Sequence, residues 1–352
     1  MLIRSAQTLS WMNDINLRLK ALAQLGEWLR SDPDEWKEIK NKARALNPWF
    51  SLKEIDRATN AIVDNMLSEN VLREWAGKYD LAADIDEKDI GLILAGNIPM
   101  VGWHDVQCVY LSGHRGLIKY SSKDDILIPF LLEKITDFDS NAESRLLKAD
   151  KLKGYDAVIA TGSNNTSRYF NSYFKNVPNI IRQHRNSVSV VNGQESRDEI
   201  EALGEDIFSY FGLGCRNVTH LYLPKGYDPA QLISVWDEVF SYVIDHNKYK
   251  NNYDYNYAIW LLNKEDFMAG VSVLMKNDDS YLARIGSVNY QYYTEIDQVA
   301  QQLTNRADAI QCIVSKQEIG THLVTKPGEA QKPAWNDYAD NVDTMKFLKN
   351  LN

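Results

Sequence analysis

A cysteine in a glycine-rich turn is the side chain of this 352-residue sequence best suited to covalent chemistry. Residues 210–218 read YFGLGCRNV, so Gly212 and Gly214 stand just before Cys215. Glycines let a backbone turn sharply, which leaves the thiol and its own N–H open to a substrate, and Arg216 can favour the thiolate. The ordinary alternative is a small buried cysteine in a turn. The sequence therefore makes Cys215 a candidate nucleophile.

Two other segments carry groups that could bind a reacting carbonyl or a phosphate. The segment 96–99 ends a short apolar run, and the Asn97 carboxamide could donate a hydrogen bond to a developing oxyanion. Thr161, Gly162 and Ser163 stand between a strand-like run and a helical one, where backbone N–H groups can face a phosphate. Taken alone, each segment is better explained as a connecting turn. Their interpretation depends on the fold that positions them.

The apolar pattern predicts the elements that would hold these groups. Up to about residue 80, apolar side chains recur every three or four positions, and the pattern breaks near Pro33 and Pro48, which predicts a helical layer. Beyond it, strand-like and helical runs alternate, with strands predicted at 90–95, 116–119, 156–160 and 187–191 and helices at 126–135 and 166–174. Such alternation is typical of βαβ units around a parallel sheet. We therefore predict an α/β protein with a helical N-terminal layer.

Composition and charge argue against several classes of partner. The formal net charge is −9 and no long Lys/Arg block occurs, so we expect no nucleic-acid partner. No apolar run approaches the ~20 residues of a membrane span, and the N-terminus meets polar residues before a signal-peptide core can form. Cys108, Cys215 and Cys312 fit neither a disulfide framework nor zinc spacing, and the histidines lack ligand spacing. We expect a soluble cytoplasmic protein without a metal.

Taken together, these segments resemble the aldehyde dehydrogenase superfamily, and more closely its acyl-CoA reductase branch, the LuxC-like fatty acid reductases. The resemblance runs from Asn47 to Leu348 and preserves the order and spacing of the family motifs. Besides the 96–99 and 210–218 segments, the matching positions are Lys119 and the segments 159–163, 328–333 and 337–340. The resemblance implies an aldehyde dehydrogenase-like fold, with a Rossmann-type cofactor domain and an α/β catalytic domain.

The resemblance also implies roles for single residues. Cys215 would be the covalent nucleophile, and Asn97 would hold the oxyanion together with the Cys215 N–H. Lys119 would touch the adenosine ribose, and the 161–163 loop would lie near the cofactor pyrophosphate. We expect a helical layer over 1–88, a dinucleotide-binding domain over 89–191, a catalytic domain over 192–325, and a C-terminal segment, 326–352, that returns to the cofactor domain or a subunit interface.

One departure from the family pattern concerns water activation. Acid-forming aldehyde dehydrogenases have a glutamate near the domain junction, whereas the matching segment 181–186 reads IRQHRN and contains no carboxylate. Without a base to activate water, hydrolysis of an acyl-enzyme should be slow. The departure favours an enzyme that passes the acyl group between hydride and a thiol.

A second departure concerns the cofactor. Many NAD-using relatives have a glutamate three residues after the ribose lysine, whereas this chain has Ser122 followed by Lys123. The change leaves room and positive charge for a 2′-phosphate, which favours NADPH, with NADH as the alternative cofactor. A solvated surface lysine explains Lys123 equally well.

The expected function is therefore NADPH-dependent reduction of an acyl thioester, such as acyl-CoA, to an aldehyde through a Cys215 acyl-enzyme, in a homo-oligomer. The rivals are NAD(P)-dependent oxidation of an aldehyde to an acid and a non-catalytic subunit that carries an acyl group. His220 could reach the nucleophile, although a packed histidine is the better default. The aromatic-rich segment 253–260 could line an acyl pocket, although packing or a subunit contact explains it better.

Overall fold

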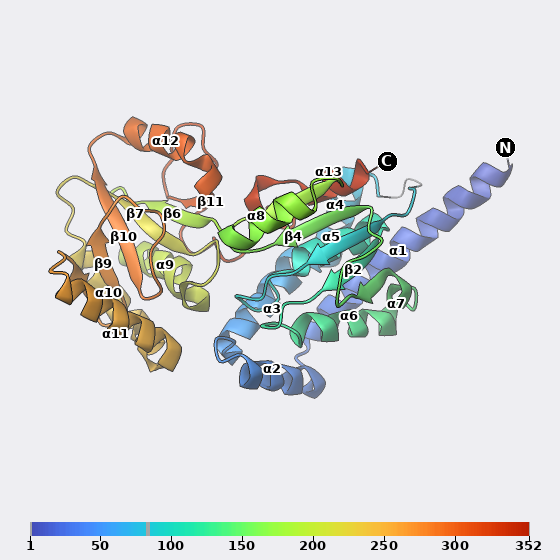
Figure 1. Ribbon diagram of the computed structural model, residues 1–352, viewed down its shortest axis with the longest axis horizontal. Helices are drawn as coiled ribbons and strands as arrows, with labels where there is room; N and C mark the ends of the chain where they lie inside the picture. Colours follow the sequence, from blue (N-terminus) through green and yellow to red (C-terminus); the bar gives the residue numbers. More distant parts are fainter. Residues whose placement is uncertain (1, 82–84, 352) are drawn as a thin grey trace. The chain divides into compact units, whose positions relative to one another are not determined.

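The computed structural model describes residues 2–81 and 85–351, and the chain divides into two compact units (Figure 1). The first unit contains residues 1–183 and 333–352, and the second contains residues 184–332. The first division falls after Gln183, whereas the sequence pattern places a domain boundary near Asn192. The chain returns to the first unit after Lys332, within the segment 326–352 that the sequence analysis sets apart.

The first unit begins with a layer of helices. Over the described residues, the helices of this layer are α1 (Leu2–Arg30), α2 (Asp34–Leu46), α3 (Leu52–Met66) and α4 (Glu69–Tyr79). Pro33 immediately precedes α2, and the Ser51 hydroxyl accepts a hydrogen bond from the Glu54 N–H at the start of α3. Helix α1 packs against α3, α4 and α6. The helices occupy the segment for which the sequence predicts a helical layer, of which residues 1 and 82–84 lie outside the described residues.

Among the described residues, a parallel five-stranded sheet forms the centre of the first unit. Its strands are β1 (Asp89–Ile93), β2 (Arg115–Lys119), β3 (Leu146–Lys148), β4 (Ala157–Thr161) and β5 (Asn179–Arg182), in the order β3-β2-β1-β4-β5. The helices between them are α5 (Trp103–Ser112), α6 (Leu127–Phe138), α7 (Ala142–Arg145) and α8 (Asn164–Tyr173). The strand order reverses between β1 and β4, and ligands bind beyond the carboxyl ends of strands at such a switch point. This sheet confirms the predicted α/β class.

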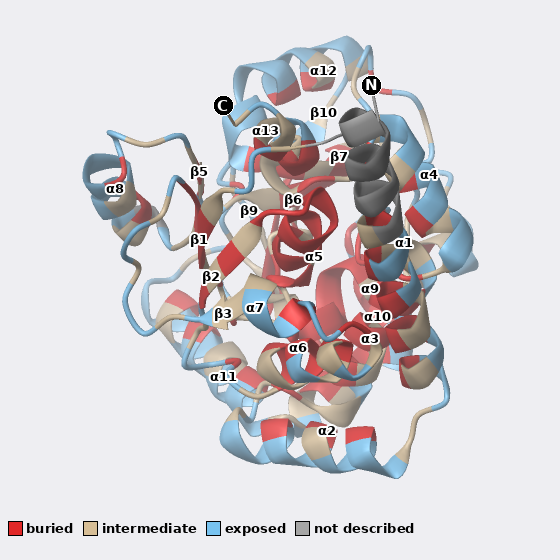
Figure 2. Ribbon diagram, turned by 90° about the vertical axis from the view of Figure 1, so that its right-hand side faces the viewer, coloured by how far each residue is buried: buried red, intermediate tan, exposed pale blue. Residues whose placement is uncertain are grey.

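Helix α5 and the C-terminal segment complete the core of the first unit. Helix α5 is buried along almost its whole length, whereas the outer face of α2 is exposed (Figure 2). Helix α13 (Thr344–Lys349) packs against α5 after the short helix η4 (Ala339–Asn341). Buried Arg182 at the end of β5 forms a salt bridge with Asp105 of α5 and donates to the Ala339 carbonyl. The C-terminal segment is thereby fixed to the first unit.

A mixed sheet, whose strands lie between Asn186 and Val314, forms the centre of the second unit. Its strands are β6 (Asn186–Val190), β7 (Val218–Pro224), β8 (Met268–Ala269), β9 (Leu274–Asn277), β10 (Ser287–Tyr293) and β11 (Ile310–Val314), in the order β11-β6-β7-β10-β9-β8. Strand β8 is antiparallel to β9, and the other pairs are parallel. The helices are α9 (Arg197–Phe208), η1 (Ser209–Gly212), α10 (Ala230–Phe240), η2 (Ser241–Asp245), α11 (Asn247–Leu262), α12 (Ile296–Asn305) and η3 (Ala307–Ala309).

The predicted strand 187–191 is present, but it belongs to the sheet of the second unit instead of to the expected sheet of the dinucleotide-binding domain. It forms β6, which pairs with β7 and β11 in the second unit, while β3 and β5 complete the first sheet. An apolar run indicates a strand but does not specify its partner. Strand β5 was missed because Asn179 and Arg182 enclose its two isoleucines.

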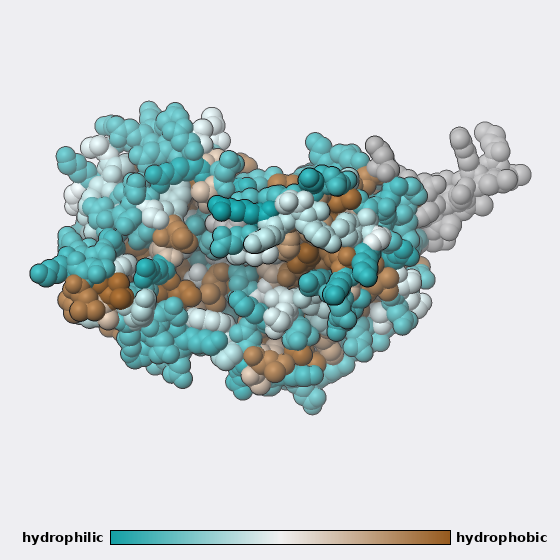
Figure 3. Space-filling view, viewed as in Figure 1, coloured by the Kyte–Doolittle hydropathy of each residue, from teal (hydrophilic) through white to brown (hydrophobic). Residues whose placement is uncertain are grey.

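The surface shown in Figure 3 is mainly hydrophilic, with apolar patches over both units, one of them in the part of the second unit that contains α10 and α11. Val239, Leu261 and Leu262 are among the exposed apolar residues of these helices. Over residues 2–81 and 85–351, no helix is both long and apolar enough to span a bilayer. The same residues contain no group of three or more His, Cys, Asp or Glu side chains placed to hold a metal ion.

Candidate active site

The loop that carries Asn97 follows β1 and is held in place by the turn that follows β2. A side chain at Gly96 would place its Cβ 2.7 Å from the Ser121 hydroxyl, so this close approach requires glycine. Met100 adopts a left-handed conformation with φ of 54°, and its N–H donates to the Asp124 carboxylate at 2.8 Å. Asn97 is half-buried within this constrained loop.

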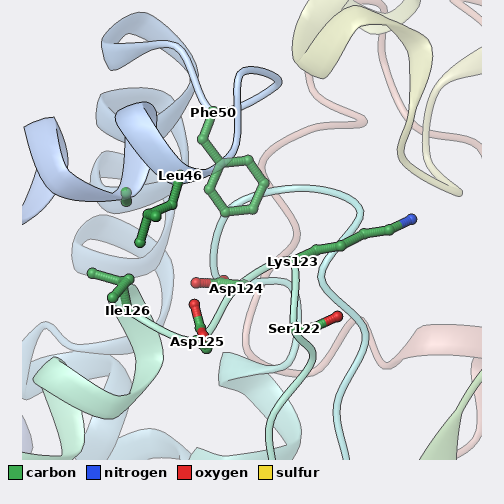
Figure 4. Close-up of a pocket in the computed structure, with 8 residues that line it drawn as sticks. Leu46, Phe50, Ser122, Lys123, Asp124, Asp125 and Ile126 are labelled. Carbon is green, nitrogen blue, oxygen red and sulfur yellow. The ribbon is translucent and has the colours of Figure 1, made fainter.

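The turn after β2 presents the residues assigned to the cofactor ribose. Lys119 ends β2, and its side chain is exposed, as are those of Ser122 and Lys123. Figure 4 shows the Ser122 and Lys123 side chains directed away from a small pocket of about 20 Å³, which has room for one water molecule. The residues that line this pocket are Ala43, Leu46, Phe50, Ser122, Lys123, Asp124, Asp125 and Ile126. The Ser122 hydroxyl and the Lys123 ammonium group point away from the pocket, although both residues contribute to its lining.

The third loop of the first unit leads from β4 into α8. Thr161 ends β4, and Gly162 allows close packing, because a Cβ there would lie 3.0 Å from the Cβ of Thr166. The Ser163 hydroxyl accepts a hydrogen bond from the Thr166 N–H and caps α8. The cap fixes the direction in which the first N–H groups of α8 point, and such groups bind anions.

The three loops open at one edge of the first sheet. In the parallel register, Ile93 of β1 is the partner of both Lys119 of β2 and Ala160 of β4, so the three strands end at the same level. The structure therefore brings together Asn97, the 119–123 segment and the 161–163 loop at the switch point of the sheet.

The turn that carries Cys215 lies in the second unit, between η1 and β7. Tyr210, Phe211 and Gly212 adopt consecutive left-handed conformations, with φ of 52°, 57° and 75°. Such conformations cost about 1–3 kcal/mol for each residue other than glycine, so surrounding contacts must enforce them. The Phe211 ring packs against His246 with 4.2 Å between ring centroids. The sequence attributes the sharp turn to glycines, whereas in the structure two aromatic residues share it.

Asn217 fixes the two ends of the turn around Cys215 to each other. Its side chain is fully buried, and its Oδ1 accepts a hydrogen bond from the Gly214 N–H at 2.7 Å. Its Nδ2 group donates to the carbonyl oxygens of Asp206, Ile207 and Ser209 at 3.1, 3.2 and 2.8 Å. One carboxamide thus joins the end of α9 to the residue before Cys215. Sequence reasoning missed this role, although Asn217 stands within the motif.

We predict that replacing Asn217 by Ala destabilises the protein by about 2–4 kcal/mol, because buried backbone groups lose their partners. Denaturant unfolding gives the stability change, and acylation of Cys215 should slow in the fraction that remains folded. Asn252, whose side chain makes an exposed contact to the Lys248 carbonyl, provides the control. A loss no larger than that of Asn252→Ala would mean that the turn holds its shape without Asn217.

A serine on β6 supports the other side of the turn. The Ser187 hydroxyl donates to the Cys215 carbonyl oxygen at 3.0 Å and lies 3.0 Å from the Sγ of Cys312 on β11. Cys215 is half-buried, whereas Cys108 is fully buried in α5, and burial raises the pKa of the Cys108 thiol. A buried neutral thiol is inert. These surroundings distinguish Cys215 from Cys108.

A buried carboxylate connects the 328–333 motif to this region. The Asp206 side chain accepts hydrogen bonds from the Gly328 N–H at 2.7 Å and the Ala330 N–H at 3.0 Å. Burial raises the pKa of Asp206 to about 7 despite these two donors. Asp206 thus holds the motif against α9, immediately before the turn around Cys215. No sequence pattern singled it out.

His220 and the aromatic-rich segment 253–260 both lie in the second unit. His220 is fully buried on β7, its Nδ1 lies 3.1 Å from the Ser280 carbonyl oxygen, and burial lowers its pKa to about 4. In the segment 253–260, the Tyr253 hydroxyl donates to the Gly270 carbonyl and Trp260 packs against Phe267. Packing in the second unit therefore accounts for the position of His220 and for Tyr253 and Trp260, whereas Tyr255 of the same segment is exposed.

The segment matched to the family's water-activating glutamate contains a buried arginine. Arg182 donates to both oxygens of Asp105, at 2.6 and 3.1 Å. The nearby carboxylate is therefore neutralised by a salt bridge and engaged by two hydrogen bonds. Asn97 belongs to the first unit and Cys215 to the second.

Comparison with known proteins identifies one curated relative. The chain is similar to the long-chain acyl-protein thioester reductase of Aliivibrio fischeri, with 23% identity over 242 residues. The match covers 63% of this chain and 50% of that protein, so the chain matches about half the length of its relative. No protein-family model matches the chain.

Solved structures of aldehyde dehydrogenases share the fold. Aldehyde dehydrogenase 21 from Physcomitrella patens has a TM-score of 0.66 at 10% identity, covering 96% of this chain and 84% of that chain. A putative aldehyde dehydrogenase from Burkholderia cenocepacia has a TM-score of 0.64 at 12% identity, covering 86% and 74%. The NAD⁺ complex of an aldehyde dehydrogenase from Bacillus cereus has a TM-score of 0.59 at 12% identity, covering 88% and 74%. The chain is therefore similar to a thioester reductase in sequence and has the fold of the aldehyde dehydrogenases.

Proposed function

We propose that this protein reduces an acyl thioester to an aldehyde through a covalent acyl-enzyme on Cys215, with NADPH as the hydride donor. The observation that carries the proposal is the turn around Cys215, which is fixed by Asn217 on one side and Ser187 on the other. Such preorganisation is what a nucleophile needs and what a packed cysteine does not require. The relative named as an acyl-protein thioester reductase supports the same chemistry.

The chain's own residues would act in a simple order. The Cys215 thiolate attacks the thioester carbon, and the Asn97 carboxamide and the Cys215 N–H hold the oxyanion that forms. The C–S bond to the departing thiol, coenzyme A or a protein thiol, then breaks and leaves the acyl group on Cys215. The cofactor, when bound, supplies hydride to the acyl carbon. Cys215 leaves as thiolate when the resulting thiohemiacetal collapses to the aldehyde.

The first unit has the features that a dinucleotide needs. Gly162 keeps the backbone before α8 free of a side chain that would collide with Thr166 and Phe170. Lys119, Ser122 and Lys123 expose a hydroxyl and two ammonium groups at the same sheet edge. Lys119 and Ser122 would hold the ribose and its 2′-phosphate, and the 161–163 loop would hold the pyrophosphate.

The fate of the acyl-enzyme favours reduction over hydrolysis. The segment 181–186 lacks a carboxylate, and the carboxylate closest to Arg182 in the structure, Asp105, is held in a salt bridge. A general base needs a carboxylate oxygen that is open to water, and both Asp105 oxygens accept hydrogen bonds from Arg182. We propose that the segment 181–186 does not activate water. The acyl group then stays on Cys215 until hydride or a thiol reacts with it.

The cofactor preference can be tested at Ser122. We predict that NADPH is preferred over NADH and that Ser122→Glu shifts the preference toward NADH, because a new carboxylate repels the 2′-phosphate and accepts a hydrogen bond from the ribose hydroxyl. Most of the shift should come from weaker NADPH binding. Values of kcat/KM for both cofactors, measured in the parent, in Ser122→Glu and in Ser122→Ala as control, decide the matter. Equal values for the two cofactors in the parent would rule out ribose recognition by this turn.

The rival functions predict different products. Oxidation of an aldehyde would give an acid with NADP⁺ or NAD⁺, and an acyl-carrying subunit would give acylated protein without nicotinamide turnover.

We further propose a cytoplasmic homo-oligomer, in keeping with the acidic composition and the reduced cysteines. Light scattering of the purified protein tests the oligomeric state.

A further inference from the structure

We propose that Asp124 is a positioning residue that couples the turn for the cofactor ribose, residues 119–125, to the loop that carries Asn97. Contact of a cofactor with the turn would then set the position of the oxyanion donor. The inference rests on the proposed function, because only that function gives Asn97 and Ser122 their roles. The coupling itself is a property of the first unit and can be measured without turnover.

One buried carboxylate joins three elements of the first unit. Asp124 is 3% exposed, and its Oδ2 accepts a hydrogen bond from the Met100 N–H at 2.8 Å. Its Oδ1 accepts from the Leu127 N–H at the start of α6, at 3.3 Å. Its own N–H donates to the Ser121 carbonyl at 3.1 Å, which closes the turn. Asp124 therefore connects the β1–α5 loop, the β2–α6 turn and α6.

Steric contact makes this connection stiff. A Cβ on Gly96 would lie 3.0 Å from the Asp124 N and 2.8 Å from the Ser121 Cβ, so the two loops touch. Met100 is held with positive φ, a conformation that its side chain disfavours and that the Asp124 hydrogen bond helps to enforce. Asn97 lies between these two points of attachment. A displacement of the turn would therefore displace Asn97.

The turn is supported from behind and exposed in front. The Asn47 side chain donates to the Lys123 carbonyl at 3.0 Å, and the Ser121 hydroxyl accepts from the Lys123 N–H at 3.2 Å. Leu46 and Phe50 of the helical layer face the same turn (Figure 4). The Ser122 and Lys123 side chains remain directed away from this support. A phosphate bound by Ser122 and Lys123 would contact the turn directly. The buried carboxylate of the same turn, Asp124, accepts a hydrogen bond from the Met100 N–H.

Protonation of Asp124 would weaken the coupling. The pKa of Asp124 is raised to about 6, mainly by burial and to a small extent by the nearby Asp125 carboxylate, while the hydrogen bonds from the Met100 and Leu127 N–H groups oppose the shift. The 96–102 loop and the first turn of α6 carry no titratable side chain, so Lys123 and Asp125 of the turn are the charged neighbours along the sequence. Above this pKa the carboxylate accepts both bonds, and below it one oxygen becomes a donor.

The test compares Asp124→Asn with Asp139→Asn. Asp139 is 5% exposed at the other end of α6 and accepts bonds from the Tyr110 hydroxyl and the Asn141 N–H, so it controls for loss of a buried carboxylate. In Asp124→Asn we expect faster amide hydrogen exchange over residues 96–102 and a kcat lower by about tenfold to a hundredfold, as misplacement of a catalytic group produces. NADPH should slow exchange over 96–102 in the parent and in Asp139→Asn but not in Asp124→Asn. We also expect kcat of the parent to fall as the pH drops below about 6, where Asp124 gains a proton, and this fall should be absent in Asp124→Asn.

A double substitution separates this inference from the proposed function. If Asp124 acts through Asn97, adding Asp124→Asn to Asn97→Ala should change kcat by less than about twofold. Fully additive losses, or unchanged exchange over 96–102 in Asp124→Asn, would overturn the coupling. If Asn97→Ala alone leaves kcat unchanged, the oxyanion role of Asn97 fails, and the exchange data still decide whether Asp124 joins the two loops.

Discussion

Replacing Cys215 by Ala should abolish both acyl-enzyme formation and aldehyde production while leaving the fold intact. The methyl group cannot attack a thioester, so no covalent intermediate can form. The turn should survive, because Ser187 binds the backbone carbonyl of residue 215 and Asn217 binds the neighbouring Gly214 N–H. Intact mass after incubation with acyl-CoA measures acylation, and thermal unfolding checks the fold.

Cys312→Ala is the matched control for this experiment. Cys312 is also half-buried and contacts the same Ser187 hydroxyl, but it lies on β11 outside the turn. It should therefore retain acylation and reduction. Appreciable reductase activity in Cys215→Ala, or loss of acylation in Cys312→Ala alone, would exclude Cys215 as the nucleophile.

Replacing Asn97 by Ala should lower kcat by about 10²–10³, the usual loss when one oxyanion donor is removed. The backbone of the loop should stay in place, because the Gly96 contact with Ser121 and the Met100 bond to Asp124 do not involve the Asn97 side chain. Steady-state kinetics with an acyl-CoA substrate separate the two kinetic constants. A loss confined to KM would make Asn97 a substrate-binding residue instead.

The sequence predicts the first sheet well where apolar runs are continuous. The run 90–95 and the run 156–160 correspond to β1 and β4, and the polar turns after them carry Asn97 and the 161–163 loop to one edge. Short or polar-flanked strands such as β3 and β5 give little apolar signal. The pairing of β6 with β7 and β11 depends on contacts between distant segments, which local periodicity does not record.

The supporting residues of the site could not be predicted for a related reason. The role of Asn217 depends on where three carbonyl groups of the preceding segment lie, and the role of Asp124 depends on the Met100 N–H, 24 positions earlier in the chain. Tyr210 and Phe211 adopt left-handed conformations that large side chains disfavour, so propensity argues against the observed turn. The candidate site residues are found by motif, whereas the residues that hold them in place require the fold.

The most direct test of the proposed chemistry is NADPH consumption by the purified protein with a panel of acyl-CoA chain lengths, with the aldehyde product measured in the same samples. We predict that NADPH oxidation and aldehyde formation occur together in equal amounts, with at least one chain length, and that both are lost in Cys215→Ala. Acylation of Cys215 without any nicotinamide turnover, or formation of an acid from added aldehyde in the absence of thioester reduction, would contradict it.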